Sequence, residues 1–265
     1  MDIAGYIASI FIGVSLGLIG GGGSILTVPV LVYLFSVDAV LATAYSLFIV
    51  GTTSVVGSIS YFKKGLVNTR SAIVFGIPSI AAVLITRAFI LPAIPKEIFS
   101  IGNFTLTKSI LLMLIFAVVM IFASYKMIRK NKSSGEETLQ KQPFNYPLII
   151  MEGIGVGVLS GLVGAGGGFL IIPALVVLSK LPMKNAVGTS LVIIASNSLI
   201  GFFGESSEAV VDYVFLAKIT AFAITGIFIG MGLSKKIDGS NLKPAFGWFV
   251  LVMGIYIIVK ETLLK

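Results

Sequence analysis

The chain has 265 residues, of which 57% are hydrophobic and only 11% are charged, and its mean hydropathy is +1.07. Soluble domains carry about 25% charged residues, so this composition predicts an all-α polytopic membrane protein. The chain has no cysteine and no histidine, which excludes disulfides, thiol nucleophiles, histidine acid–base catalysis and zinc sites built on these residues. The net charge of +8 is interpreted as the positive-inside bias of a membrane protein, with no nucleic-acid partner.

Eight uncharged runs follow one another along the chain, and six of them suit one membrane-spanning helix each. A helix crosses the hydrocarbon core in about 20 residues. The six runs are residues 39–62, 71–86, 109–125, 185–204, 219–234 and 244–259. The other two, 3–37 and 153–179, are long for one crossing and short for two. Each is interpreted as a re-entrant or discontinuous helix pair that turns near the midplane and returns to the same side as a half-helix.

Glycines interrupt both long runs, at Gly20, Gly21, Gly22, Gly23 and Ser24 in the first and at Gly164, Ala165, Gly166, Gly167 and Gly168 in the second. Non-helical backbone at membrane depth is tolerated only inside protein or along a polar cavity. Each turn would offer backbone N–H groups and the positive end of a half-helix dipole, which bind an anion without formal charge. Ser24 is expected to cap the first half-helix. The alternative is close packing, the role assigned to Gly153, Gly157 and Gly161.

Polar residues in the helices after each turn are candidates for lining the anion site. They are Thr43, Ser46, Thr52, Thr53 and Ser54 in the first half and Thr189, Ser190, Ser196, Asn197 and Ser198 in the second. Hydroxyls in membrane helices commonly bond back to their own helix, which is the alternative for each one. Glu152 is either a proton-coupling group or an interfacial residue. Arg87 and Lys218 are placed near outer helix ends, where long side chains snorkel to the interface.

The basic residues gather in four loops, which are therefore placed in the cytoplasm. They are Lys63, Lys64 and Arg70; Lys126, Arg129, Lys130, Lys132 and Lys141; Lys180 and Lys184; and Lys235, Lys236 and Lys243. The loop 205–212 carries three acids and no cation and is placed outside. The resulting path puts both termini outside the cell membrane.

The chain repeats itself at an offset of 144 residues, which pairs the two glycine segments and matches Pro29 with Pro173. Repeat 1 is predicted over 1–128, a cytoplasmic linker over 129–145 and repeat 2 over 146–265. Equivalent loops carry opposite charge: Lys63 and Lys64 correspond to the acidic loop 205–212, and the loop 92–108 to the basic 235–243. This pattern predicts two inverted-topology repeats, each a glycine-broken helix pair plus three transmembrane helices.

The paired glycine segments, their prolines and the sequence Ala186-Val-Gly-Thr-Ser-Leu191 resemble the TauE/SafE family of sulfite exporters over essentially the whole chain. The resemblance implies transport of sulfite or small organosulfonates such as sulfoacetate across the cell membrane. One departure is Ala44-Tyr45, where the second half has Gly188-Thr189. Tyr45 is therefore added to the candidate site, where its ring would narrow the cavity or stack on a substrate.

The leading hypothesis is a secondary transporter that exports a small sulfur-containing oxyanion by alternating access about a midplane site formed by the two glycine turns. No cofactor is expected, and the partners are the anion and the bilayer, with homo-oligomerisation left open. The alternative is an anion channel, or a permease for sulfate or a carboxylate. An intramembrane enzyme is disfavoured because the chain holds no constellation that would perform hydrolysis. An accessory subunit is disfavoured because the repeat already builds a complete unit.

Overall fold

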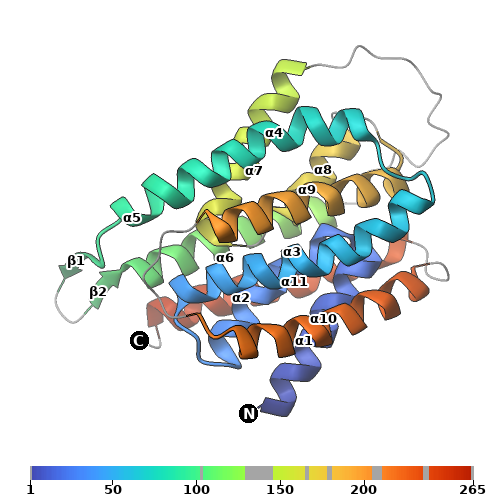
Figure 1. Cartoon of the computed structure of the whole chain (residues 1–265). Helices are drawn as coiled ribbons and strands as arrows, with labels where there is room; N and C mark the ends of the chain where they lie inside the picture. The colour runs from blue at the N-terminus through green and yellow to red at the C-terminus, as the bar shows by residue number, and fades with distance from the viewer. Residues whose placement is uncertain are drawn as a thin grey trace.

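The computed structural model describes residues 2–101, 104–128, 146–164, 167–177, 181–204, 211–234 and 239–263, and these ranges are almost entirely helical (Figure 1). The first half holds α1 (Asp2–Ile19), η1 (Gly21–Gly23), α2 (Ser24–Tyr33), α3 (Ala39–Lys63), α4 (Thr69–Ile85), η2 (Thr86–Ile90), α5 (Leu91–Ala93), β1 (Glu97–Ile101), β2 (Phe104–Thr107) and α6 (Lys108–Ile128). The second half holds α7 (Tyr146–Val163), α8 (Gly168–Val177), α9 (Met183–Phe203), α10 (Tyr213–Leu233) and α11 (Gly239–Leu263).

Five helices within the described residues are long and apolar enough to cross a membrane. They are Ala39–Lys63, Thr69–Ala93, Tyr146–Val163, Lys184–Phe203 and Tyr213–Leu233. The all-α polytopic architecture predicted from composition is therefore confirmed. The predicted linker 129–145 lies outside the described residues.

The helices of the two halves correspond at a constant spacing. In the second half, α7, α8, α9 and α10 each begin 144 residues after α1, α2, α3 and α4. The backbone therefore repeats with the offset found in the sequence.

The third helices of the two halves, α3 and α9, form an antiparallel pair in the centre of the molecule. A Cβ atom on Gly57, late in α3, would lie 3.4 Å from Leu191 Cδ1, early in α9. Conversely, a Cβ atom on Gly201, late in α9, would lie 3.3 Å from Leu47 Cδ1, early in α3. Equivalent helices of the two halves thus run in opposite directions here. Inversion of the halves across a bilayer stays a prediction.

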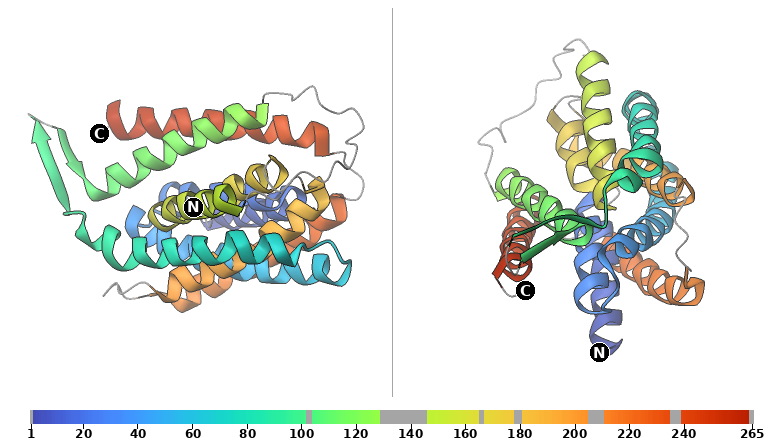
Figure 2. Two further views of the ribbon diagram at one scale, coloured as in Figure 1. Left: turned by 90° about the horizontal axis from the view of Figure 1, so that it is seen from above. Right: turned by 90° about the vertical axis from the view of Figure 1, so that its left-hand side faces the viewer.

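Glycines bring two further helix pairs into backbone contact, and each pair joins the two halves. Gly226 of α10 packs against the backbone of Ile10 and Val14 in α1. Gly153, Gly157 and Gly161 of α7 face α4 and η2, where Phe75, Ser79 and Thr86 lie. The packing role predicted for these three glycines is confirmed. Figure 2 shows a fourth pair, α6 and α11, at one side of the molecule.

Four of the described basic residues, Lys63, Lys64, Arg70 and Lys184, lie at one end of the molecule, here called the basic end. The loop after α3 meets the first turns of α9 there, because Asn68 N–H donates to Thr189 Oγ1 at 2.9 Å. Arg70 Cζ lies 5.2 Å from the centre of the Tyr146 ring at the start of α7. The opposite end, called the Asp212 end, holds Asp212 and also Asp38, which accepts a hydrogen bond from Ser109 at 3.0 Å.

The first interrupted run is a re-entrant pair. The Phe35 ring, just after α2, lies 5.8 Å from the Tyr6 ring near the start of α1. At the turn, a Cβ atom on Gly23 would lie 2.6 Å from the carbonyl oxygen of Ile12 in α1, so α2 folds back along α1. This run therefore begins and ends at the same end of the molecule, as predicted.

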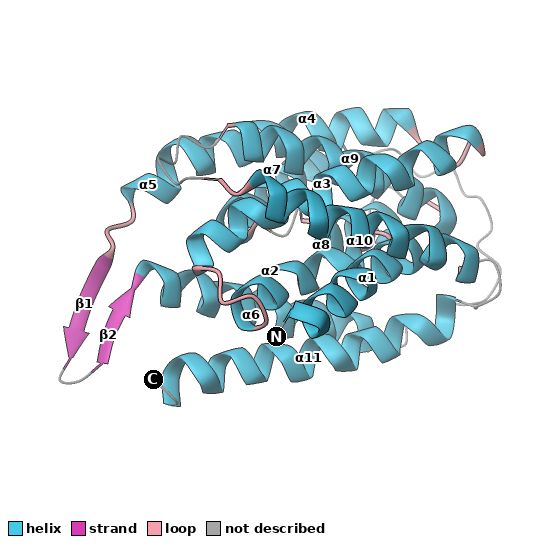
Figure 3. Cartoon of the chain, turned by 60° about the horizontal axis from the view of Figure 1, so that its bottom comes forward, coloured by secondary structure: helices cyan, strands magenta, loops and turns pink. Residues whose placement is uncertain are grey.

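Two elements between α4 and α6 were not predicted. The strands β1 and β2 form an antiparallel hairpin with Phe99 opposite Leu106, and the hairpin projects from the helices (Figure 3). The π-helical segment η2 precedes it. The expectation that Arg87 snorkels is wrong, because its side chain is only 1% exposed. Within η2, Thr86 and Arg87 are buried, while Phe89 is 71% exposed.

Candidate functional site

The two glycine turns meet, and the half-helices that follow them begin at the contact. Gly168, the first residue of α8, lies against the backbone of Gly21 in η1, and a Cβ atom on Gly168 would lie 2.8 Å from the Gly21 carbonyl oxygen. Because α2 begins at Ser24, the N-termini of α2 and α8 converge. The positive ends of two helix dipoles therefore lie close together, in a region where Gly20, Gly21, Gly167 and Gly168 are all buried.

The turns need glycine at equivalent positions of the two halves. Gly20 and Gly164, 144 residues apart, both have φ of +73°, and Gly167 has φ of +68°. Residues with a Cβ rarely adopt this left-handed conformation, whereas glycine adopts it without steric cost. Ala165 and Gly166 of the second turn lie outside the described residues.

Each turn packs against a helix of the opposite half. A Cβ atom on Gly20 would lie 3.1 Å from Val187 Cγ1 and 3.2 Å from Ser190 Oγ in α9. Gly164 packs in the same way against Thr43 in α3, the position equivalent to Val187. The site is therefore built jointly by both halves, and neither half contains it alone.

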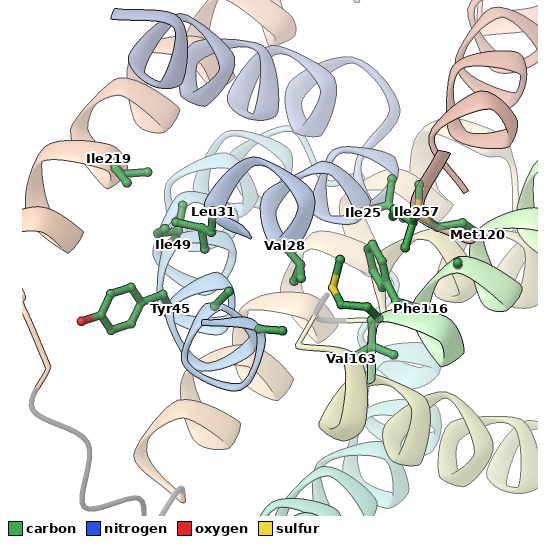
Figure 4. Close-up of a cluster of buried hydrophobic side chains, with 14 of the residues drawn as sticks. Ile25, Val28, Leu31, Tyr45, Ile49, Phe116, Met120, Val163, Ile219 and Ile257 are labelled. Carbon is green, nitrogen blue, oxygen red and sulfur yellow. The ribbon is translucent and has the colours of Figure 1, made fainter. Parts of the chain in front are cut away.

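Apolar side chains fix the position of the first half-helix. Val28 of α2, Phe116 and Met120 of α6 and Val163 at the end of α7 belong to one buried cluster, which Figure 4 shows in close-up. Val163 directly precedes Gly164, so this cluster also holds the entry to the second turn.

The expected cap at Ser24 is not formed. Its hydroxyl donates to the Gly21 carbonyl oxygen at 2.7 Å, and the start of α2 receives no hydrogen bond from a capping side chain. The physical reason is the short helix η1, which makes Ser24 the first residue of α2 and not the residue before it. The positive end of α2 is thus left without a side-chain acceptor.

Three of the predicted lining hydroxyls bond to their own helices. One is Ser196, whose Oγ donates to the Val192 carbonyl oxygen at 3.0 Å. Thr43 Oγ1 donates to the Val40 carbonyl oxygen at 2.7 Å, and Ser190 Oγ donates to the Val187 carbonyl oxygen at 2.8 Å. This is the back-bonding that was the alternative for every hydroxyl. The hydroxyls of Thr43 and Ser190 therefore already donate a hydrogen bond within their own helix, although Ser190 lies against the first turn.

Tyr45 and Thr189 form hydrogen bonds between the two halves. Asp212 N–H donates to Tyr45 Oη at 2.8 Å, and Asn68 N–H donates to Thr189 Oγ1 at 2.9 Å. Both side chains are buried, with exposures of 3% and 0%. Sequence reasoning missed Asn68, and used Asp212 only as an acid of the loop 205–212, because candidate residues were sought in helices and glycine turns.

Five further predicted residues have a buried side-chain oxygen that makes no hydrogen bond with the described residues: Ser46, Thr53, Ser54, Asn197 and Ser198. Two residues that were not predicted, Thr27 of α2 and Ser160 of α7, share this property. Leaving one such group unsatisfied costs about 1–3 kcal/mol. Thr27 and Ser160 were missed because the sequence argument searched only the helices after each half-helix.

Asn197 can present a donor to this region. Its Nδ2 donates to Ser79 Oγ at 2.6 Å, which leaves Oδ1 unpaired. If the amide rotates by half a turn, the Ser79 hydroxyl donates to Oδ1 and Nδ2 becomes available. Ser46 and Asn197 stay predicted site residues, each with a buried oxygen that has no partner among the described residues.

Glu152 does not lie at the glycine turns. It is twelve residues before Gly164 on α7, a separation of about 18 Å along a helix. Its neighbour Gly153 packs against Phe75 of α4. A coupling role for Glu152 stays a prediction. The described residues hold no group of three or more acids that could bind a metal ion.

Comparison with known proteins agrees with this architecture. The family profile described as Sulfite exporter TauE/SafE matches residues 6–257. A probable membrane transporter protein of Xylella fastidiosa (strain Temecula1) is 30% identical, covering 93% of this chain and 91% of its own length. A probable membrane transporter protein of Methanocaldococcus jannaschii is 28% identical, covering 96% and 94%. The transporter YunE of Bacillus subtilis, also named as probable, is 27% identical and covers 91% of each chain. No solved structure matches. The chain therefore belongs to the TauE/SafE sulfite exporter family of multi-pass membrane transporters.

Proposed function

We propose that the protein is a secondary transporter that exports a small sulfur-containing oxyanion, sulfite or an organosulfonate, across the cell membrane. The observation that carries this proposal is the meeting of the two glycine turns, where the N-termini of α2 and α8 converge. Helix N-termini favour anions, and α3 packs against the second turn through Thr43. The same helix carries the buried hydroxyls of Ser46 and Ser54, which have no partner among the described residues.

The candidate site carries no formal positive charge among its described residues. Sulfite and sulfonates each present three oxygens on one sulfur, which suits several separate donors. An anion held by dipoles and hydroxyls also leaves more easily than one paired with a buried arginine, because no strong ion pair has to be broken. This supports a site that binds and releases its ligand in every cycle.

Alternating access is supported by the way the halves are joined. Each turn packs against a helix of the opposite half, so a movement of one half relative to the other changes both sides of the site at once. The orientation that we propose places the basic end in the cytoplasm and both termini outside.

The chain has no cysteine, so single cysteines can test this orientation. We expect a membrane-impermeant maleimide applied to whole cells to label Ser109→Cys and to leave Lys64→Cys unlabelled. Labelling of Lys64→Cys but not of Ser109→Cys would show that the orientation is the reverse of the one proposed.

Flux into proteoliposomes tests the transported substrate and separates a transporter from a channel. We expect uptake of labelled sulfite that saturates with concentration and is accelerated by sulfite or sulfoacetate on the opposite side. Uptake that rises linearly with sulfite concentration and is not accelerated by an anion on the opposite side indicates the alternative, an anion channel. Uptake of sulfate or a carboxylate in place of the sulfur compounds indicates a different permease.

Asn197→Leu should weaken binding without unfolding the protein, because leucine has a similar volume and the amide is buried. A hydrogen bond to a charged group contributes roughly 1.5–3 kcal/mol, so the KM for the transported anion should rise about tenfold or more. The measurement is the concentration dependence of flux. Thr225→Val is a matched control, because the Thr225 hydroxyl bonds to Ala221 of its own helix α10. An unchanged KM for Asn197→Leu would show that Asn197 does not bind the transported anion.

A further inference from the structure

We propose that Tyr45 and Thr189 are gate residues whose hydroxyls form two hydrogen-bonded latches, one at each end of the molecule, that open alternately. The Tyr45 latch is the bond from Asp212 N–H to Tyr45 Oη, and the Thr189 latch is the bond from Asn68 N–H to Thr189 Oγ1. The proposal rests on the proposed alternating-access transport and assigns the residues that control it.

The two latches occupy equivalent positions of the two halves. Tyr45 and Thr189 are 144 residues apart, and so are Asn68 and Asp212. Each loop residue also caps the helix that follows it: Asn68 Oδ1 accepts from Ser71 N–H at 2.9 Å, and Asp212 Oδ1 accepts from Phe215 N–H at 2.9 Å. The side chain of the cap therefore fixes the start of α4 or α10, while its backbone N–H holds that start against the opposite half.

The latches lie at opposite ends because α3 and α9 are antiparallel. Tyr45 is near the start of α3, at the Asp212 end, and Thr189 is near the start of α9, at the basic end. Figure 4 shows the Tyr45 hydroxyl pointing away from the apolar cluster around α2. Both bonds are made in the structure, in which Gly20 and Gly21 of the first turn and Gly164 and Gly167 of the second are buried.

Each latch restrains a helix pair that carries one glycine turn. The Tyr45 latch holds α10, which is bound through Gly226 to α1, and α1 leads into the first turn. The Thr189 latch holds α4, which is bound through Gly157 to α7, and α7 leads into the second turn. Release of one latch thus frees one pair at one end, while the other latch keeps the other end closed.

The unequal residues at the two positions have a structural reason. At the basic end, Gly188 lets the Leu66 carbonyl approach α9, and a Cβ atom there would lie only 2.6 Å from that oxygen. The short hydroxyl of Thr189 then reaches Asn68. The equivalent of Gly188 is Ala44, and at that end the longer side chain of Tyr45 spans the gap to Asp212. The same connection is made by different side chains.

Accessibility of a single cysteine tests the latches without any substrate. The reporter is Ser54→Cys, since Ser54 is fully buried on α3 between the two latches. A charged thiosulfonate is applied to sealed vesicles of each orientation, and the ratio of labelling rates from the Asp212 end and the basic end is measured. Tyr45→Phe and Thr189→Val each remove one hydroxyl and keep the shape. Tyr213→Phe, beside Asp212 but 67% exposed, and Thr225→Val are the controls.

We expect Tyr45→Phe to raise labelling from the Asp212 end and Thr189→Val to raise it from the basic end, each roughly two- to tenfold, the change that loss of one ordinary hydrogen bond produces. The double variant should return the ratio toward the wild-type value, and the controls should leave it unchanged. The latch proposal would be overturned if both variants raised labelling equally from the same end. It would also be overturned if neither ratio changed while both variants kept the thermal stability of the wild type. If the latches fail this test but sulfite flux is saturable, the proposed transport function still holds. If the labelling ratios shift as expected but no saturable sulfite flux is seen, only the proposed substrate is rejected.

Discussion

Gly21→Val should abolish anion flux, with a loss of about 100-fold or more. A Cβ atom on Gly21 would overlap the backbone of Gly168, so any side chain forces the two turns apart. The converging helix N-termini would then no longer face one ligand. Because electrostatic attraction to a dipole end falls off within one helical turn, even a small separation removes the anion site. The measurement is sulfite uptake by proteoliposomes that contain equal amounts of folded protein.

Gly155→Val is the matched control for this prediction. Gly155 lies in α7, nine residues before Gly164, and a Cβ atom there meets nothing within 4 Å. It should transport like the wild type. The reciprocal variant Gly168→Ala should lose flux as Gly21→Val does, since it creates the same overlap from the other side. Wild-type flux in both turn variants would show that the contact between the turns has no part in transport.

Gly226→Leu should destabilise the protein more than any other helix substitution considered above. A Cβ atom on Gly226 would overlap the Ile10 carbonyl oxygen and lie 2.9 Å from Val14 N and 3.0 Å from Gly13 Cα, which are backbone atoms of α1 that cannot move aside. Overpacking of this kind costs about 1–3 kcal/mol, occasionally more. The melting temperature in detergent should therefore fall by several degrees or more.

Gly232→Leu, six residues later on α10, gives the comparison. A Cβ atom there meets nothing within 4 Å, so its melting temperature should match that of the wild type. If both variants melt alike, α1 and α10 do not pack as the structure describes. Loss of stability at Gly226 with flux retained at low temperature would separate the packing role of this glycine from the transport site.

The parts of the fold that depend on regular patterns could be predicted from the sequence. Uncharged runs locate membrane helices because the hydrocarbon core fixes their length. The repeat predicted that Gly20 and Gly164 would occupy equivalent turns, and both indeed have φ of +73°. Packing glycines at four-residue spacing were also recognisable, because residues four apart lie on one face of a helix.

The parts that depend on long-range contacts could not be predicted. Nothing near Arg87 in the sequence indicates a π-helical turn, so its burial follows only from the packing of η2 against α7. Thr189 was chosen as a lining residue for its polarity, and Tyr45 because it departs from the equivalent residue of the second half. The partners of their hydroxyls lie 121 and 167 residues away. Short-range patterns suggest which residues are polar and buried. They do not show which of those residues already have a partner.

The most direct test of the anion site is ligand protection of a single cysteine at Ser46, whose buried hydroxyl has no partner among the described residues. Sulfoacetate is the appropriate ligand, because sulfite itself attacks thiosulfonate reagents. Saturating sulfoacetate should slow labelling of Ser46→Cys from both ends of the molecule, and the protection should disappear in the Gly21→Val background. Labelling at the same rate with and without sulfoacetate, in protein that transports it, would contradict an anion site at the meeting of the two glycine turns.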